Sequence, residues 1–284
     1  MKKALVIFNP MAGAKKLVDT RRVIEETLKK ANYSYDFFET IKAERQPLDQ
    51  FLGKSYDRVI VSGGDGTVAE VTSFLISNKV KAPLIIIPQG TANILAISLG
   101  LPLAPKAALN RGLKSEGRPL DAMRVNGKYY GTIATGCGYD TVIMADTSRD
   151  MKRKIGFMAY IWTMLKTLFI YRTSPYRISV DGERYTVLAK TIMTFNILPL
   201  GNLGVTKPFL GTPIAPDDGL LNIFVLNPRP IRDFFRFRKA LRIMKGKEIS
   251  ISNKKERRYQ IDGNVFKGKK VTIKVIPKAF YVCY

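Results

Sequence analysis

Hydrophobic and polar residues follow two different patterns along the chain. In the first 120 residues, apolar runs are each followed by a turn of small residues and then by a helical segment. The runs are ALVIF at 4–8, DRVIVS at 57–62 and PLIIIP at 83–88, and YDFFET at 35–40 is a further strand. Strands that alternate with helices predict a parallel sheet layered with helices.

From about Asp121 the pattern changes to short alternating runs between turn residues, typical of an antiparallel sandwich or a curled sheet. These runs are KYYGTIATG, YRISVDG, RYTVLAKTIMTFN, LLNIFVL, KEISISN, RRYQIDG and KKVTIKVIP. Two helices are predicted between them, at 155–171 and 231–246. We therefore predict an α/β domain over 1–120 and a β-rich, sandwich-like domain over 121–284.

The amino-acid composition limits the kinds of partner and of catalysis that the chain can use. The net charge of +24 attracts phosphate-rich partners, which are nucleotides, nucleic acids or an anionic membrane surface. The chain has no His, which excludes Ser-His-Asp and Cys-His catalysis and most zinc chemistry. Cys137 and Cys283 form no disulfide framework and fit a reducing compartment. Phosphoryl transfer remains compatible, because it depends on positioning, Mg²⁺ and carboxylates.

Glycine-containing turns follow the apolar runs, at 9–13, 63–67 and 89–93. In parallel sheets, ligands bind beyond the carboxyl ends of the strands, where these turns lie. Glycine lets main-chain N–H groups approach an anion, and the following helix adds its positive end. We expect a polyphosphate at these turns, with Asp65 facing the transferring group or its metal ion; the alternative is a tight turn without ligand. A P-loop and a dinucleotide fingerprint are both absent from the sequence.

Five motifs together resemble the diacylglycerol kinase catalytic family, which includes YegS-like lipid kinases and sphingosine kinases. They are GGDGT at 63–67, IPQGTANILA at 87–96, GCGYDTVI at 136–143, KRKIGFMAY at 152–160 and APDDGLLNIFVL at 215–226. The resemblance covers nearly the whole chain in the family's order. It implies an NAD kinase-like α/β domain and a β-rich domain with catalysis in the cleft between them. It also implies ATP and Mg²⁺ as cofactors and a membrane lipid as the substrate.

The resemblance assigns site residues position by position. ATP contacts are implied for Asn9, Gly13, Thr40, Gly63, Gly64, Asp65, Gly66, Thr67, Val68, Ala69, Gly90, Thr91, Asn93 and Lys154. Lys154 lies in the cationic run Lys152–Lys154, which is otherwise a solvated helix start. Asp65 and Asp121 match acids that organise Mg²⁺ and water.

The resemblance also implies a structural Mg²⁺ and a substrate contact. The metal ligands are the carboxylate of Asp218 and the main-chain carbonyls of Ala215 and Leu220, hard oxygen donors that suit Mg²⁺. Asp140 falls in a region that meets the substrate head group, or it caps a turn.

The sequence departs from the family pattern at two places. Asn93 is followed by Ile94 where the family often has Asp, which favours the sphingosine-kinase-like branch. Near the C-terminus, Asp262-Gly263-Asn264 replaces an Asp-Gly-Glu whose Glu is the general base. An amide cannot accept the proton, and general-base help is worth about 10²–10⁴-fold. Asp65 is then the base, or Asp262 substitutes, or the protein is a weak or inactive relative.

Membrane contact is expected from the predicted helix at 231–246. Its apolar face carries Phe234, Phe237, Leu241 and Met244 among six Lys and Arg residues, which suits an anionic membrane interface or packing on the sheet. The segment 155–171 is expected to be a buried or interfacial helix, because Lys166 interrupts a span that is already short. We therefore predict a cytoplasmic lipid kinase that associates peripherally with the inner face of the membrane.

Other function classes remain as alternatives. One is a non-catalytic nucleotide or anionic-lipid binding relative, and another is an NAD kinase-type enzyme, which the Gln-Gly-Thr-Ala-Asn turn disfavours. Nucleic acid is not expected as a partner, because the sequence shows no recognised DNA- or RNA-binding module. The oligomeric state, including a homodimer, stays open.

Overall fold

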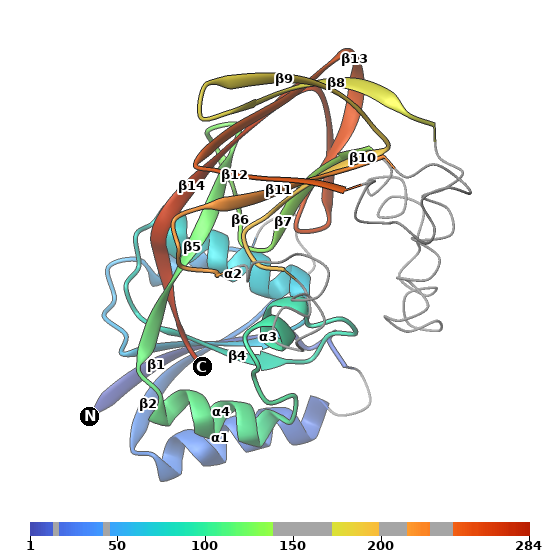
Figure 1. Cartoon of the computed structure of the whole chain (residues 1–284). Coiled ribbons are helices and arrows are strands. Elements are labelled where there is room, and N and C mark those ends of the chain that lie inside the picture. Colours follow the sequence, from blue (N-terminus) through green and yellow to red (C-terminus); the bar gives the residue numbers. More distant parts are fainter. Residues whose placement is uncertain (14–16, 42–45, 139–171, 199–214, 228–240) are drawn as a thin grey trace. The chain divides into compact units, whose positions relative to one another are not determined.

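The computed structural model describes residues 1–13, 17–41, 46–138, 172–198, 215–227 and 241–284 (Figure 1). The chain divides into two compact units, here called the first unit (Met1–Leu120 with Lys278–Tyr284) and the second unit (Asp121–Pro277). The predicted second domain over 121–284 thus differs from the second unit at its end. Residues 278–284 belong to the first unit because Val282 pairs in parallel with Leu84 and is buried there.

The first unit is built on a parallel sheet. Its strands are β1 (Lys2–Phe8), β2 (Tyr33–Glu39), β3 (Arg58–Gly63), β4 (Leu84–Pro88) and the end of β14 (Asn264–Cys283), in the order β14-β4-β3-β1-β2. β1 and β2 align Lys2 with Tyr33, and β3 and β4 align Val59 with Leu84. Because these strands run in the same direction, the turns that follow β1, β3 and β4 leave the same edge of the sheet.

Helices cover this sheet. They are α1 (Leu17–Lys30), α2 (Asp65–Ser77), α3 (Ile94–Ser98) and α4 (Pro105–Lys114), with a short 3₁₀ helix at Leu48–Phe51. α1 and α4 lie side by side (Figure 1). Their buried residues Ile24, Leu28 and Leu109 join one core with sheet residues such as Val6 and Ile60. The hydrophobic pattern predicts the other three helices but misses α4, which begins at a proline.

The second unit is antiparallel, as the alternating pattern predicts. Its strands are β5 (Gly117–Val125), β6 (Tyr129–Gly131), β7 (Ala134–Gly138), β8 (Ser174–Val180), β9 (Glu183–Ala189), β10 (Thr191–Phe195), β11 (Leu221–Leu226), β12 (Leu241–Gly246), β13 (Glu248–Ile261) and β14. β5 begins within the first unit. The strand order is β12-β11-β10-β7-β13-β14, with β8 and β9 attached to β13 and with β5 and β6 attached to β14.

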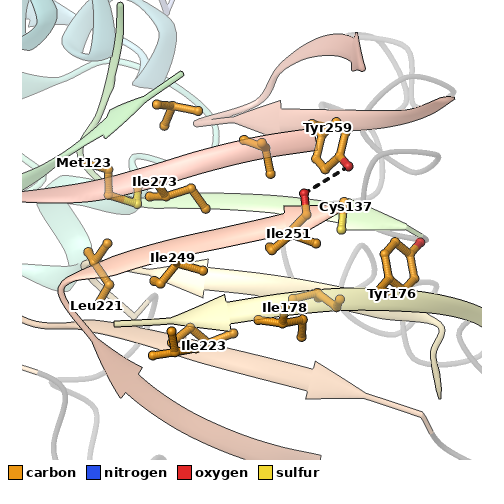
Figure 2. Packing of buried hydrophobic residues seen from close by; sticks show 14 of the residues in the cluster. Met123, Cys137, Tyr176, Ile178, Leu221, Ile223, Ile249, Ile251, Tyr259 and Ile273 are labelled. Carbon is orange, nitrogen blue, oxygen red and sulfur yellow. Dashed lines mark hydrogen bonds between the residues drawn. The ribbon is translucent and has the colours of Figure 1, made fainter. Parts of the chain in front are cut away.

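The two halves of β13 pair with different strands of the second unit. The first half of β13 pairs with β8 through Ile249 and Ile251, and its last residues pair with β7 through Tyr259. An irregularity between Ser252 and Arg257 separates the two halves. Figure 2 shows the resulting core, where the Tyr259 hydroxyl lies 3.5 Å from the carbonyl oxygen of Ile251.

One predicted helix is wrong where the structure describes it. Residues 241–246, the end of the helix expected at 231–246, form strand β12, which pairs antiparallel with β11 from Leu241↔Leu226 onward. Met244 packs against the core of the second unit, and the Arg242 guanidinium lies 4.7 Å from the centre of the Tyr185 ring. Sheet pairing and core contacts therefore override a helical spacing that is short and ambiguous. Phe234 and Phe237 lie outside the described residues.

The predicted helix at 155–171 also lies outside the described residues. Among the residues that are described, no helix is both long enough and apolar enough to cross a membrane.

Candidate active site

The GGDGT stretch joins β3 to α2, and α2 begins inside it, at Asp65. Gly64 is the N-cap residue and brings no side chain to cap the first turn of the helix. Gly63 packs tightly, because a Cβ there would lie 2.7 Å from the Cβ of Thr67. At Gly66, by contrast, a Cβ would meet nothing within 4 Å. The turn therefore presents an uncapped helix start with open space at Gly66, an arrangement that can accept an anion.

The three glycine turns contact one another at the sheet edge. A Cβ on Gly90 would lie 2.7 Å from the Cα of Gly64, and a Cβ on Gly13 would lie 3.0 Å from Oε1 of Gln89. The Gln89 N–H donates to the Gly63 carbonyl at 2.9 Å. Gly13 also has a φ of +69°, which side chains rarely adopt. Glycine is thus needed at Gly13, Gly64 and Gly90 so that the turns can pack together, whatever they bind.

Two asparagines shape these turns. The Nδ2 of Asn9 donates to Oγ1 of Thr67 at 2.7 Å, which ties the turn after β1 to α2. Asn93 sits at a φ of 46° and holds Gly90 through both ends of its amide, at 2.7 Å to the Gly90 N–H and 2.8 Å to the Gly90 carbonyl. Both residues therefore act on the shape of the turns.

Asp65 is half-buried and linked to the start of α3. One carboxylate oxygen accepts the Ile94 N–H at 2.6 Å. Burial raises the pKa of this carboxyl above its ordinary value, although main-chain N–H groups of Ile94, Asn93 and neighbouring residues act in the opposite direction. A carboxylate that is partly desolvated yet still ionisable suits both metal coordination and proton acceptance.

The remaining ATP-contact candidates differ in where the structure places them. Thr40 follows β2, and its N–H donates to the Phe8 carbonyl at 2.8 Å. Thr91 is exposed, whereas Val68 is buried, so its side chain serves packing. Asp140 and the run Lys152–Lys154 lie outside the described residues.

In the second unit, Asp121 holds the turn at 215–220. The Asp121 side chain is buried, and its Oδ2 accepts the Gly219 N–H at 2.6 Å. Its main-chain N–H donates to the Pro216 carbonyl at 2.8 Å. β5, which carries Asp121, is not predicted from the pattern.

The same turn contains the implied Mg²⁺ ligands. Asp218 is exposed, and its Oδ1 accepts the Leu220 N–H at 3.0 Å. Within the described ranges no group of three acidic, His or Cys side chains could hold a metal. A metal here would instead use one carboxylate, main-chain carbonyls of Ala215 and Leu220, and water. These hard oxygen donors fit Mg²⁺.

The Asp262-Gly263 pair forms the two-residue turn between β13 and β14, with φ values of 45° and 93°. This is the Asp-Gly signature of a tight hairpin. Oδ2 of Asp262 accepts the Thr132 N–H at 2.6 Å, and Oδ1 accepts the N–H groups of Ile133 at 3.0 Å and Ala134 at 2.8 Å. Burial raises the pKa of Asp262, and these N–H donors oppose the rise. Because both oxygens are engaged, the geometry favours a positioning role over a base.

Asn264 is the first residue of β14 and is exposed. It aligns with Ile261 at the end of the hairpin. The hydrogen-bonded Asp262 turn therefore fixes where Asn264 begins β14.

Sequence reasoning missed Asn196, which lies at the end of β10 and is fully buried. Its Nδ2 donates to the Asp121 carbonyl at 2.8 Å and to the Thr132 carbonyl at 3.0 Å. Thr132 in turn donates to Asp262 through its N–H and hydroxyl. One buried amide thus links the Asp121 turn to the Asp262 hairpin. No motif marks this residue in the sequence.

Comparisons with known proteins agree with this architecture. The profile of the diacylglycerol kinase catalytic domain matches residues 3–125, and the YegS C-terminal NAD kinase beta sandwich-like domain matches residues 132–284. A Staphylococcus carnosus protein named "Putative lipid kinase" is 30% identical over 245 residues, which cover 82% of this chain and 78% of that protein. A Pseudomonas aeruginosa protein named "Probable lipid kinase YegS-like" is 34% identical over 186 residues, 66% of this chain and 59% of that protein.

A solved structure from Bacillus anthracis, titled as a "putative diacylglycerol kinase", has a TM-score of 0.81 and 27% identity. The alignment covers 100% of this chain and 95% of that one. The fold predicted from the sequence, an α/β domain followed by a β sandwich-like domain, is confirmed.

Proposed function

The chain belongs to the diacylglycerol kinase catalytic family of YegS-like lipid kinases, and from this we propose that it transfers the γ-phosphoryl group of ATP to a hydroxyl of a membrane lipid. The observation that carries the proposal is the cluster of three packed glycine turns at one edge of the parallel sheet, beside the half-buried carboxylate of Asp65. Phosphoryl transfer depends mainly on positioning and electrostatics, which such an edge supplies.

In this proposal the first unit binds the nucleotide. Main-chain N–H groups at Gly64–Thr67 donate hydrogen bonds to the phosphates, and the positive end of α2 attracts them, since Gly64 supplies no capping side chain. Asn9 and Asn93 keep the turns in register. Mg²⁺, when bound, neutralises charge on the phosphates. Asp65 would organise water around that ion. In the second unit, the 215–220 turn, which Asp121 holds, would bind a structural ion.

Asp65 is the proposed proton acceptor. The lipid hydroxyl oxygen bonds to the γ-phosphorus while the bond from that phosphorus to the bridging oxygen breaks, and ADP leaves. The hydroxyl proton passes to the Asp65 carboxylate, whose raised pKa brings it closer to the operating pH than an ordinary Asp. Asp262 positions the hairpin, and Asn264 donates a hydrogen bond to the substrate or a phosphate.

The test is a kinase assay with labelled ATP, Mg²⁺ and a lipid panel of diacylglycerol, sphingosine, ceramide, monoacylglycerol and phosphatidylglycerol. Asp65→Asn keeps an oxygen for the Ile94 N–H but loses the proton acceptor. We expect it to lower turnover at least a hundredfold while the variant still melts in a cooperative transition. Glu116→Gln, an exposed neutralisation, is the matched control. Unchanged turnover in Asp65→Asn would contradict the assigned site.

The second candidate is a nucleotide-binding or anionic-lipid-binding relative without catalysis. Asn264 favours it, because an amide stands where the family has its base. ATP binding by calorimetry without product on any lipid would support it. A product from NAD and ATP would instead favour an NAD kinase-type enzyme.

We place the active protein peripherally on an anionic membrane, at the cytoplasmic face. The net charge of +24 supports this placement. Cell fractionation tests it, and recovery solely away from membranes would contradict it.

A further inference from the structure

A segment of the β13–β14 hairpin is exposed and strongly basic. Residues 253–258 and 266–270, here called the basic ribbon, lie where β13 has left β8 and has not yet reached β7. The ribbon's exposed cations are Lys254, Lys255, Arg258, Lys267, Lys269 and Lys270, and its acid is Glu256. Arg257 is more enclosed and donates to Ser174 at 3.1 Å. The exposed side chains of the ribbon therefore carry a net charge of 6 − 1 = +5.

Like charges face each other across the ribbon, which destabilises the sheet there. Arg258 and Lys267 are direct cross-strand partners, and like charges in that position repel. Among the described residues, the ion pair on these strands joins Lys274 to Glu248, and none joins the six ribbon cations to an acid. An anionic surface would supply the missing counter-charge.

Exposed apolar side chains adjoin the ribbon. Val265 is 40% exposed and Tyr129 is 44% exposed. The Tyr129 ring stacks on Phe266 with centroids 6.3 Å apart, and Nζ of Lys128 lies 4.6 Å from the Tyr129 ring centre. Tyrosine beside cations and an aliphatic residue is typical of a membrane–water interface. Val265 also directly follows Asn264, so this surface begins at the proposed substrate position.

We infer that the basic ribbon, with Tyr129 and Val265 at its edge, docks the protein onto anionic lipid head groups of a bilayer. The inference rests on the proposed function for its choice of a lipid surface over a nucleic acid. Each engaged cation strengthens binding by about fivefold at low salt. The attraction is screened at high salt.

The test is co-sedimentation with vesicles of phosphatidylcholine alone or with 30% phosphatidylglycerol, at about 50 mM and 500 mM NaCl and without ATP. The ribbon variant replaces Lys254, Lys255, Lys267 and Lys269 by Gln. The charge-matched control replaces four exposed lysines of the first unit by Gln: Lys29, Lys30, Lys81 and Lys106. A third variant replaces the four ribbon lysines by Arg.

We expect the ribbon variant to lose at least tenfold in partitioning onto anionic vesicles at low salt, while the first-unit control and the Arg variant bind like wild type. Equal losses in ribbon variant and control would overturn the inference, because they would show that net charge alone drives binding. If the ribbon variant binds vesicles like wild type but no longer binds a uridine oligonucleotide, the inference is overturned and the ribbon is an RNA-binding surface instead. Melting curves check that each variant is folded.

The assay separates this inference from the proposed function. Vesicle binding requires no catalysis. If the protein phosphorylates no lipid but its sedimentation with vesicles depends on the ribbon lysines, the docking surface stands and the proposed kinase activity is refuted. If the ribbon variant phosphorylates lipid and sediments with vesicles as well as wild type does, the proposed kinase activity stands and the docking surface is refuted.

Discussion

Two buried asparagines, Asn196 directly after β10 and Asn222 on the neighbouring β11, should respond oppositely to the same substitution. Asn196 donates its amide hydrogens to the Asp121 and Thr132 carbonyls. Asn222, on β11, is equally buried, and neither of its amide atoms has a hydrogen-bond partner among the described residues. Leu has the same branched arrangement of heavy atoms as Asn, so Asn196→Leu and Asn222→Leu change polarity while keeping the side-chain shape, and the larger volume of Leu is common to both variants.

The magnitudes follow from the hydrogen bonds. Asn196→Leu removes the side-chain donor from two main-chain carbonyls, at about 1–3 kcal/mol each. This is partly offset by about 1–2 kcal/mol from the apolar side chain and by the loss of the buried Oδ1, which has no partner among the described residues. We therefore expect a net loss of up to about 5 kcal/mol in the free energy of unfolding. Asn222→Leu removes a polar group that is buried without partners, which is worth about 1–3 kcal/mol in favour of the variant. We expect it to be neutral or stabilising.

Urea unfolding followed by circular dichroism measures both variants. Hydrogen exchange adds a local readout, because Asn196→Leu should speed exchange at Gly219 and Ile133, whose N–H groups depend on the Asp121 and Asp262 carboxylates. Asn222→Leu should leave those amides unchanged. If Asn222→Leu destabilises as much as Asn196→Leu, or if exchange at Gly219 does not change, the linking role of Asn196 is refuted.

Three more predictions concern the glycine turns, Asp65 and Asp262. Gly90→Ala should destabilise by about 1–3 kcal/mol and weaken ATP binding by calorimetry, because its Cβ would overlap Gly64, whereas Gly66→Ala should melt no lower than wild type. The folded chain holds the Asp65 proton more tightly than the unfolded chain, so that contribution to stability is present below about pH 3.8 and is lost as pH rises through the folded pKa. Asp65→Asn should flatten this slope in urea titrations, and an unchanged slope would contradict the raised pKa. Asp262→Asn should lower the free energy of unfolding by about 2–4 kcal/mol, since its NH₂ would face main-chain N–H donors; an unchanged midpoint would contradict this.

The glycine turns were predictable because their signal is local. A β-rich run followed by small residues fixes both the strand end and the turn, and parallel strands then bring such turns to one edge. The role of Asp262 as an acceptor for main-chain groups near Thr132 was not predictable, because the partners are separated by about 130 residues in sequence. Asn196 carries no motif, since its function depends on two carbonyls rather than on any side-chain pattern.

The ends of elements were the other source of error. Residues 241–246 fit a helical stripe and a strand equally well, and only the pairing with β11 decides between them. In the same way, the alternating pattern at the C-terminus shows a strand but cannot show which sheet it joins. That depends on the register of Val282 with Leu84.

This last pairing has a consequence for biosynthesis. Residues 1–120 of the first unit are synthesised well before residues 278–284, yet the sheet and core of that unit include Val282 and Cys283. Most domains fold in order as they are synthesised. Here the first unit stays incomplete until residues 278–284 have been synthesised, so a nascent chain that lacks them leaves the flank of β4 open to chaperones or to another copy of the same strand.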